Sequence, residues 1–134
     1  MKLLLDTDVC IAILNRDERV RAPLSRHAPS QLRMSAITLA ELRFGVAKSA
    51  NGRRAGANLR MLLSKIAAVP FDNAATERYG NLRALLEARG TPIGPLDTLI
   101  AAHALSLGWG LVTHNRREFR RVPGLRVQDW LGED

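Results

Sequence analysis

Six oxygen-bearing side chains fall where an expected strand ends or an expected helix begins. They are Asp6, Asp8, Glu41, Asp97, Asn115 and Glu118. Acids that converge on one crevice cannot all stay ionised unaided, because like charges at close range raise each other's pKa. A divalent cation removes that conflict, and all-oxygen ligation suits a hard ion such as Mg²⁺ or Mn²⁺ better than zinc. Such an ion can supply a hydroxide-like water and stabilise charge on a phosphoryl group, so the pattern indicates metal-assisted hydrolysis of nucleic acid.

Each acid also has a structural interpretation that the sequence leaves open. Thr38 and Glu41 have the spacing of a capping box, in which Glu41 only satisfies a free backbone N–H. Asp97 stands in a first helical turn, where it suits the helix dipole, and Asp8 could be the N-cap of the first helix. Asp6 directly follows three leucines at the end of a strand, and the pattern gives it no capping role. Asp6 is therefore the strongest functional candidate of the set.

Short strands that alternate with helices position these side chains. The apolar runs predict strands at residues 3–5, 32–36, 68–71, 111–113 and 125–128. The helical patterns cover residues 8–14, 18–27, 38–48, 59–66, 75–86 and 99–107. This alternation is typical of an α/β fold in which helices cover both faces of a parallel sheet. Sites in such folds form beyond the carboxyl ends of the strands, which is where the acids fall.

Length and composition predict a single domain over residues 1–134. Hydrophobic residues make up 46% of the chain, but no stretch approaches the roughly 18–20 uncharged apolar residues of a membrane span. The first residues become charged too soon for a signal peptide, so we expect a cytoplasmic protein. Cys10 is the only cysteine and lies in an apolar run, which predicts a core residue and excludes an internal disulfide.

The net charge is +7, from 20 Lys and Arg against 13 Asp and Glu. The lysines are Lys2, Lys48 and Lys65, so the other 17 basic residues are arginines. Arginine suits phosphate, and a basic surface captures polyanions, so nucleic acid is one expected partner. An acidic protein partner or an ordinary solvated surface would explain the charge equally well. The six aromatic residues argue against a base-stacking surface.

Basic side chains also follow the fourth predicted strand. They are His114, Arg116, Arg117, Arg120 and Arg121. His114, Arg116 and Arg117 are candidate RNA contacts, and a solvated loop is the alternative. His103 lies on the apolar stripe of residues 99–107 and is expected to pack in the core, with a functional hydrogen bond as the second interpretation.

Four segments, in this order, resemble PIN-domain proteins and, more narrowly, the VapC toxins of bacterial toxin–antitoxin pairs. They are LLDTD at 4–8, SAITLAELRFG at 35–45, GTPIGPLDTLIAAH at 90–103 and LVTHNRREF at 111–119. The similarity extends from Met1 to about Leu131. The resemblance implies a three-layer α/β/α sandwich on a five-stranded parallel sheet. It also implies a Mg²⁺- or Mn²⁺-dependent endoribonuclease, many of whose relatives act on tRNA or rRNA.

Carried over position by position, the resemblance places the metal-binding acids on Asp6, Glu41 and Asp97. The fourth polar position falls between Thr113 and Glu118, where Asn115 stands in place of the aspartate of many PIN domains. Asn115 is thus a further catalytic candidate. The supporting positions around the metal are Thr7, Asp8, Thr113 and Glu118. Asp8 replaces the asparagine that usually follows Asp-Thr.

The resemblance also implies a cognate VapB-like antitoxin, an RNA substrate and a homodimer or toxin–antitoxin hetero-oligomer. Ile11, Ile13, Leu14 and the 59–66 helix could serve either the core or such an interface, and periodicity does not separate the two. Two other functions stay open. One is a phosphatase of the haloacid-dehalogenase type that uses Asp6 as nucleophile, although the three lysines are poorly placed for it. The other is a non-catalytic RNA-binding PIN domain.

Overall fold

Five short parallel strands form the centre of the protein. A computed structural model describes residues 1–132 of the chain. The strands are β1 (Leu3–Leu5), β2 (Leu32–Ser35), β3 (Ala67–Val69), β4 (Gly110–Val112) and β5 (Val127–Gln128). They lie in the order β3-β2-β1-β4-β5, and every pair of neighbours is parallel. The predicted five-stranded parallel sheet is confirmed, with β5 shorter than expected.

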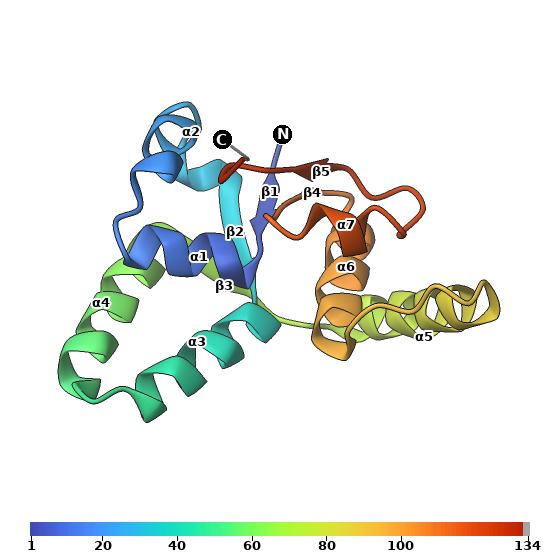
Figure 1. Ribbon diagram of the computed structural model, residues 1–134, viewed down its shortest axis with the longest axis horizontal. Helices are drawn as coiled ribbons and strands as arrows, with labels where there is room; N and C mark the ends of the chain where they lie inside the picture. The colour runs from blue at the N-terminus through green and yellow to red at the C-terminus, as the bar shows by residue number, and fades with distance from the viewer. Residues whose placement is uncertain (133–134) are drawn as a thin grey trace.

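Helices cover both faces of this sheet, as Figure 1 shows. On one side lie α1 (Thr7–Leu14), α3 (Ala36–Lys48) and α4 (Gly52–Lys65). On the other side lie α5 (Asn73–Ala88), α6 (Pro95–Leu107) and the short α7 (Arg116–Phe119). The three-layer α/β/α arrangement is thus confirmed. Among residues 1–132, no helix is both long and apolar enough to cross a membrane.

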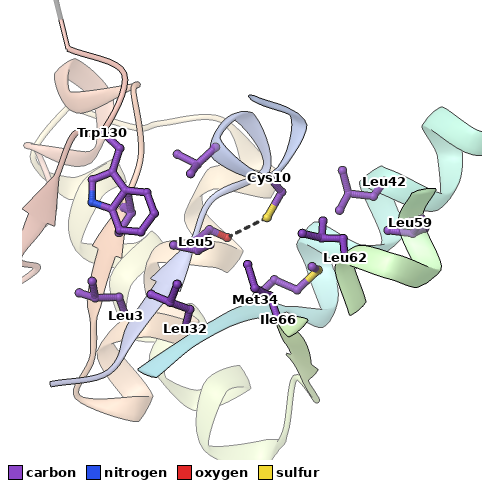
Figure 2. Packing of buried hydrophobic residues seen from close by; sticks show 12 residues of the cluster. Leu3, Leu5, Cys10, Leu32, Met34, Leu42, Leu59, Leu62, Ile66 and Trp130 are labelled. Atoms are coloured by element: carbon purple, nitrogen blue, oxygen red, sulfur yellow. Dashed lines mark hydrogen bonds between the residues drawn. The ribbon is translucent and has the colours of Figure 1, made fainter. Parts of the chain in front are cut away.

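The two cores follow from the alternation of side chains along β1. Leu3 and Leu5 point into the cluster beneath α1, α3 and α4, whereas Leu4 points into the cluster beneath α5 and α6. All three leucines are at most 1% exposed, so each contributes on the order of 2 kcal/mol of burial free energy. Cys10 packs in the first cluster, with its sulfur directed at the carbonyl of Leu5 (Figure 2). Burial raises the pKa of its thiol, which confirms Cys10 as a core residue.

Local differences from the predicted elements have steric and packing causes. The single helix expected at residues 18–27 is divided into a 3₁₀ turn, η1 (Glu18–Val20), and α2 (Arg21–Ser25). Pro23 lacks an N–H and cannot sit inside a continuous helix, which explains the division. A further 3₁₀ turn, η2 (Pro29–Gln31), was not predicted. On α6, Ile100 is fully buried, whereas Leu99 is only partly buried.

The strand order determines where a site can form. The chain moves from β1 to β2 and β3 on one side, and later to β4 and β5 on the other. The order therefore reverses at β1, between its neighbours β2 and β4. A crevice forms at such a switch point, beyond the carboxyl ends of the strands. The first residues after β1, β2 and β4 face this crevice.

Candidate active site

Asp6 is the first residue after β1 and its carboxylate is held on both oxygens. The backbone N–H of Thr7 donates to Oδ1 at 2.8 Å, which makes Asp6 the N-cap of α1. The hydroxyl of Thr113 donates to Oδ2 at 2.7 Å across the sheet. The expectation that Asp6 has no capping role was therefore wrong, as was the interpretation of Asp8 as the N-cap. Asp6 can cap α1 and still be a functional candidate, because an N-cap uses only one carboxylate oxygen.

Asp6 is also the carboxylate least favoured in its ionised form. It is 5% exposed. Burial, and then the charge of Asp8, raise its pKa to about 7 against the lowering effect of the bonds from Thr113 and Thr7. Asp97 adds a smaller repulsion. A carboxylate with so high a pKa is one that a cation would stabilise strongly.

Asp97, in the first turn of α6, faces several other acids. Burial raises its pKa to about 6, with the charges of Glu118, Glu41 and Asp8 adding to the effect. The side-chain amide of Asn115 donates to Oδ2 of Asp97 at 3.3 Å and opposes the shift. Asp97 suits the dipole of α6, but that interpretation does not explain why three other carboxylates act on its charge.

Glu41, on α3, faces the crevice and takes no part in capping. Its Oε1 accepts a hydrogen bond from the Thr7 hydroxyl, which also lies 3.2 Å from the hydroxyl of Thr38. The N-cap of α3 is Ser35, whose hydroxyl accepts from the N–H of Ile37. The capping-box interpretation of residues 38 and 41 was therefore wrong, because the helix begins two residues before Thr38.

Glu118 and Asn115 bridge the start of α6 to α7. Glu118 accepts the Gly94 N–H on Oε1 at 3.1 Å and the Asn115 amide on Oε2 at 3.2 Å. The Gly94 bond is the main cause of the lowered pKa of Glu118. Asn115 thus donates to Asp97 and Glu118 together, and its backbone N–H bonds to Thr113. It holds two acids in place with hydrogen-bond donors.

Asp8 lies on the other flank of the crevice. The backbone N–H of His114 donates to its Oδ2 at 3.0 Å. Its Oδ1 is buried and has no hydrogen-bond partner within the described residues. Burial is the largest cause of its raised pKa.

Asp129, which was not predicted as a site residue, organises the basic side chains beside the crevice. Its side chain is 5% exposed, and it lies 3.1 Å from Nε of Arg116 and 3.2 Å from Nδ1 of His114. No pattern in the sequence signals this role, because Asp129 follows a two-residue strand near the end of the chain. Arg117, the third predicted RNA contact, is exposed on α7.

His103 is fully buried on α6, which confirms its predicted place in the core. Its Nδ1 is also 2.8 Å from the hydroxyl of Ser35, and its ring meets Phe71 edge-on. Burial lowers the pKa of the imidazole, so the neutral form is favoured. His103 therefore ties α6, which carries Asp97, to the start of α3.

The chemistry of the donor set fits a hard divalent cation. The crevice offers carboxylates from three elements with raised pKa values or mutual repulsion, together with the orphaned oxygen of Asp8. Within residues 1–132, however, no three His, Cys, Asp or Glu side chains are already grouped as a metal site. Like charges without a cation favour such separation, so the donor types, and not a preformed cage, support the fit.

Known proteins resemble the chain over nearly its full length. The sequence profile of the PIN domain matches residues 3–125. The chain is 40% identical over 131 residues to the tRNA(fMet)-specific endonuclease VapC of Salmonella typhimurium, covering 97% of this chain and 98% of that protein. It is 36% identical over 132 residues to Ribonuclease VapC2 of Rickettsia felis, covering 97% and 98%. Its fold is similar to that of DNA-bound VapBC from Salmonella typhimurium, with a TM-score of 0.91, 40% identity and coverage of 97% and 98%. A second solved structure, VapBC2 from Rickettsia felis bound to a promoter DNA fragment, gives a TM-score of 0.90 at 34% identity, covering 97% and 99%.

Proposed function

The chain belongs to the PIN-domain family, among its VapC ribonucleases, and we propose that it cleaves RNA at the crevice beyond β1, β2 and β4. The observation that carries this proposal is the convergence of Asp6, Glu41 and Asp97 from three separate elements. The charge of Glu41 acts on Asp97, the charge of Asp97 acts on Asp6, and burial keeps the pKa of Asp6 near 7. Such an arrangement disfavours the metal-free state and favours a bound cation.

Asp6, Glu41 and Asp97 would hold the ion, Mg²⁺ or Mn²⁺. When bound, it supplies a water of lowered pKa and stabilises charge on the phosphoryl group. The chain's own task is orientation. Thr113 fixes Asp6, and Thr7 fixes Glu41. Asn115 fixes Asp97 against Glu118, so each of the three acids is held by a hydrogen-bond donor before substrate arrives.

The substrate and partners follow from the relatives. One relative is named for cleavage of tRNA(fMet), so an initiator tRNA is the first substrate to test. The solved neighbours are VapBC complexes, and we propose that this chain is likewise held by a VapB-like antitoxin in the cytoplasm, as a homodimer or hetero-oligomer. The net charge of +7 favours capture of a polyanion.

The alternatives have no support in the comparisons. The haloacid-dehalogenase chemistry needs a lysine to balance the phosphate charge, and none of the three lysines is among the groups whose charge acts on Asp6. A non-catalytic RNA-binding domain would have no need for carboxylates that repel one another. Both alternatives are separated from the proposal by one experiment.

The experiment is cleavage of a tRNA(fMet) transcript by antitoxin-free protein with Mg²⁺, Mn²⁺ or EDTA. Asp6→Asn is the sharpest variant, because asparagine keeps the N-cap acceptor of α1 while removing the charge. Asp72→Asn is the matched control, since Asp72 caps α5 in the same way on an exposed surface. Metal-dependent cleavage that is lost in Asp6→Asn and kept in Asp72→Asn supports the proposal. Cleavage that persists in Asp6→Asn, or in EDTA, would contradict it.

A further inference from the structure

Asp129 divides its two carboxylate oxygens between two tasks. Oδ1 accepts the backbone N–H groups of Leu131 at 2.9 Å and Gly132 at 3.0 Å. Oδ2 faces Nε of Arg116 at 3.1 Å and Nδ1 of His114 at 3.2 Å. Burial alone would raise the pKa of Asp129, but the two backbone bonds and His114 outweigh it and lower the pKa. Asp129 is thus an ionised anchor for two basic side chains.

These two side chains adjoin the acidic crevice. His114 and Arg116 are the neighbours of Asn115 in the chain, and Asn115 bonds to Asp97. The backbone N–H of His114 also donates to Asp8, on the flank of the crevice. The anchored pair is therefore joined to the crevice by two hydrogen bonds.

The anchored arginine keeps free donor capacity, and the anchored histidine remains accessible. Arg116 uses Nε toward Asp129, and its two terminal nitrogens have no partner within residues 1–132. His114 uses Nδ1, and its side chain remains 45% exposed. Arginine binds phosphate through its terminal nitrogens in a planar fork. An arginine already held at Nε loses less conformational freedom on binding than a free one.

We propose that His114 and Arg116, anchored on Asp129, form a binding site for a backbone phosphate of the RNA, adjacent to the bond cut in the acidic crevice. The inference rests on the proposed function and adds a phosphate-binding site to it. The acidic crevice repels RNA phosphates until a cation is bound, so the fixed guanidinium of Arg116 at its rim would offset that repulsion.

The first test is binding of a fluorescent tRNA(fMet) transcript by anisotropy, in an Asp6→Asn background with Mg²⁺, over a series of salt concentrations. Arg116→Ala should weaken binding about tenfold and reduce the slope of log affinity against log salt by about 0.7–0.9, the value for one phosphate contact. Arg83→Ala is the matched control, because Arg83 is also an exposed arginine paired with a carboxylate, Glu87. Equal effects of the two variants would overturn the inference.

Asp129→Asn provides the sharper test, because charge and geometry predict opposite results. Asparagine can still accept the backbone N–H groups on Oδ1, but it places an amide donor where Arg116 and His114 now meet Oδ2. Loss of a negative charge by itself should tighten RNA binding. The anchored site predicts weaker binding by about threefold to tenfold. Asp17→Asn, which removes a carboxylate paired with Arg19 elsewhere on the surface, is the control for charge alone.

The outcomes of these experiments distinguish failure of the phosphate site from failure of the proposed ribonuclease function. Wild-type cleavage together with Asp129→Asn binding as tightly as Asp17→Asn would overturn the phosphate site and leave the nuclease intact. Wild-type protein that neither binds nor cleaves tRNA would overturn both. A melting temperature close to that of wild type establishes that each variant is folded, and Arg116→Ala, an exposed substitution, tests the site even where Asp129→Asn does not fold.

Discussion

Two sets of carboxylates lie side by side at the same edge of the sheet and behave in opposite ways. In the crevice, burial raises the pKa of Asp6 to about 7 and that of Asp97 to about 6. On the rim, hydrogen bonds from the chain itself lower the pKa of Asp129 and of Glu118. Burial and nearby acids outweigh the hydrogen bonds that the crevice acids accept, whereas hydrogen bonds and nearby basic side chains outweigh burial for Asp129 and Glu118.

The comparison distinguishes carboxylates whose charge is stabilised by the protein itself from carboxylates whose charge is left for a ligand to stabilise. Asp129 has four donors around its carboxylate, so its negative charge stabilises the folded protein without any ligand. Asp6 keeps a charge near Asp8 and Asp97 at a cost that the folded protein alone does not offset. A ligand that supplies positive charge would change only the second kind of site.

The largest expected effect is on catalysis. Asp97→Asn should reduce cleavage by about a thousandfold or more, because it removes a metal ligand. The same change should leave the melting temperature in EDTA unchanged or raised, since it removes one of several repelling charges. Single-turnover cleavage and thermal unfolding of the same preparation check both expectations. A melting temperature well below that of wild type would make Asp97 a structural residue.

The second effect is the pH dependence of metal-free stability. Asp6 has a raised folded pKa, so it stays protonated in the folded state after its unfolded counterpart ionises near pH 3.8. The free energy of unfolding should therefore fall as pH rises from about 4 to 7, by at most about 4 kcal/mol from this group. Urea unfolding in EDTA across this range measures the slope. Asp6→Asn should flatten it, and an equally steep slope in the variant would place the cause elsewhere.

A bound divalent metal ion should reverse this loss of folding stability. A cation that binds only the folded state at a hundred times its dissociation constant adds about 2.7 kcal/mol of stability. The gain should be larger at pH 7.5 than at pH 5.5, because Asp6 and Asp97 must lose their protons to bind. Melting temperatures with and without Mn²⁺ at the two pH values measure it. Asp97→Asn should remove the difference, whereas Asp72→Asn should retain it.

The sequence could predict the crevice acids and the basic residues after β4, but not Asp129, which anchors two of those basic residues, for a physical reason. The acids of the crevice follow buried strands, and parallel strands bring their carboxyl ends together whatever the details of the loops. The rim depends on particular contacts between α7 and the segment after β5. With four and two residues, α7 and β5 are too short to show a periodic pattern.

The caps were mispredicted for a related reason. Sequence spacing marks Thr38 and Asp8 as good capping residues, but the strands end at Leu5 and Ser35, so the helices begin earlier. Asp6 and Ser35 therefore become the N-caps. A difference of one or two residues in where a helix begins thus changes which side chain caps it.

The smallest expected effect is on the stability of the rim. Asp129 has a lowered pKa, so its contribution is present above the unfolded pKa near 3.8 and is lost as pH falls through the folded value. Asp129→Asn should therefore cost about 1–2 kcal/mol at pH 7 and less at pH 3, because hydrogen bonds to a charged group contribute about 1.5–3 kcal/mol and those to a neutral group about 1 kcal/mol. The pH trend is opposite in sign to that of Asp6→Asn. Urea unfolding of both variants in EDTA compares the signs directly. If Asp129→Asn instead stabilised the protein at pH 7, the rim carboxylate would be a repelling group like those of the crevice, and the contrast between the two sets would fail.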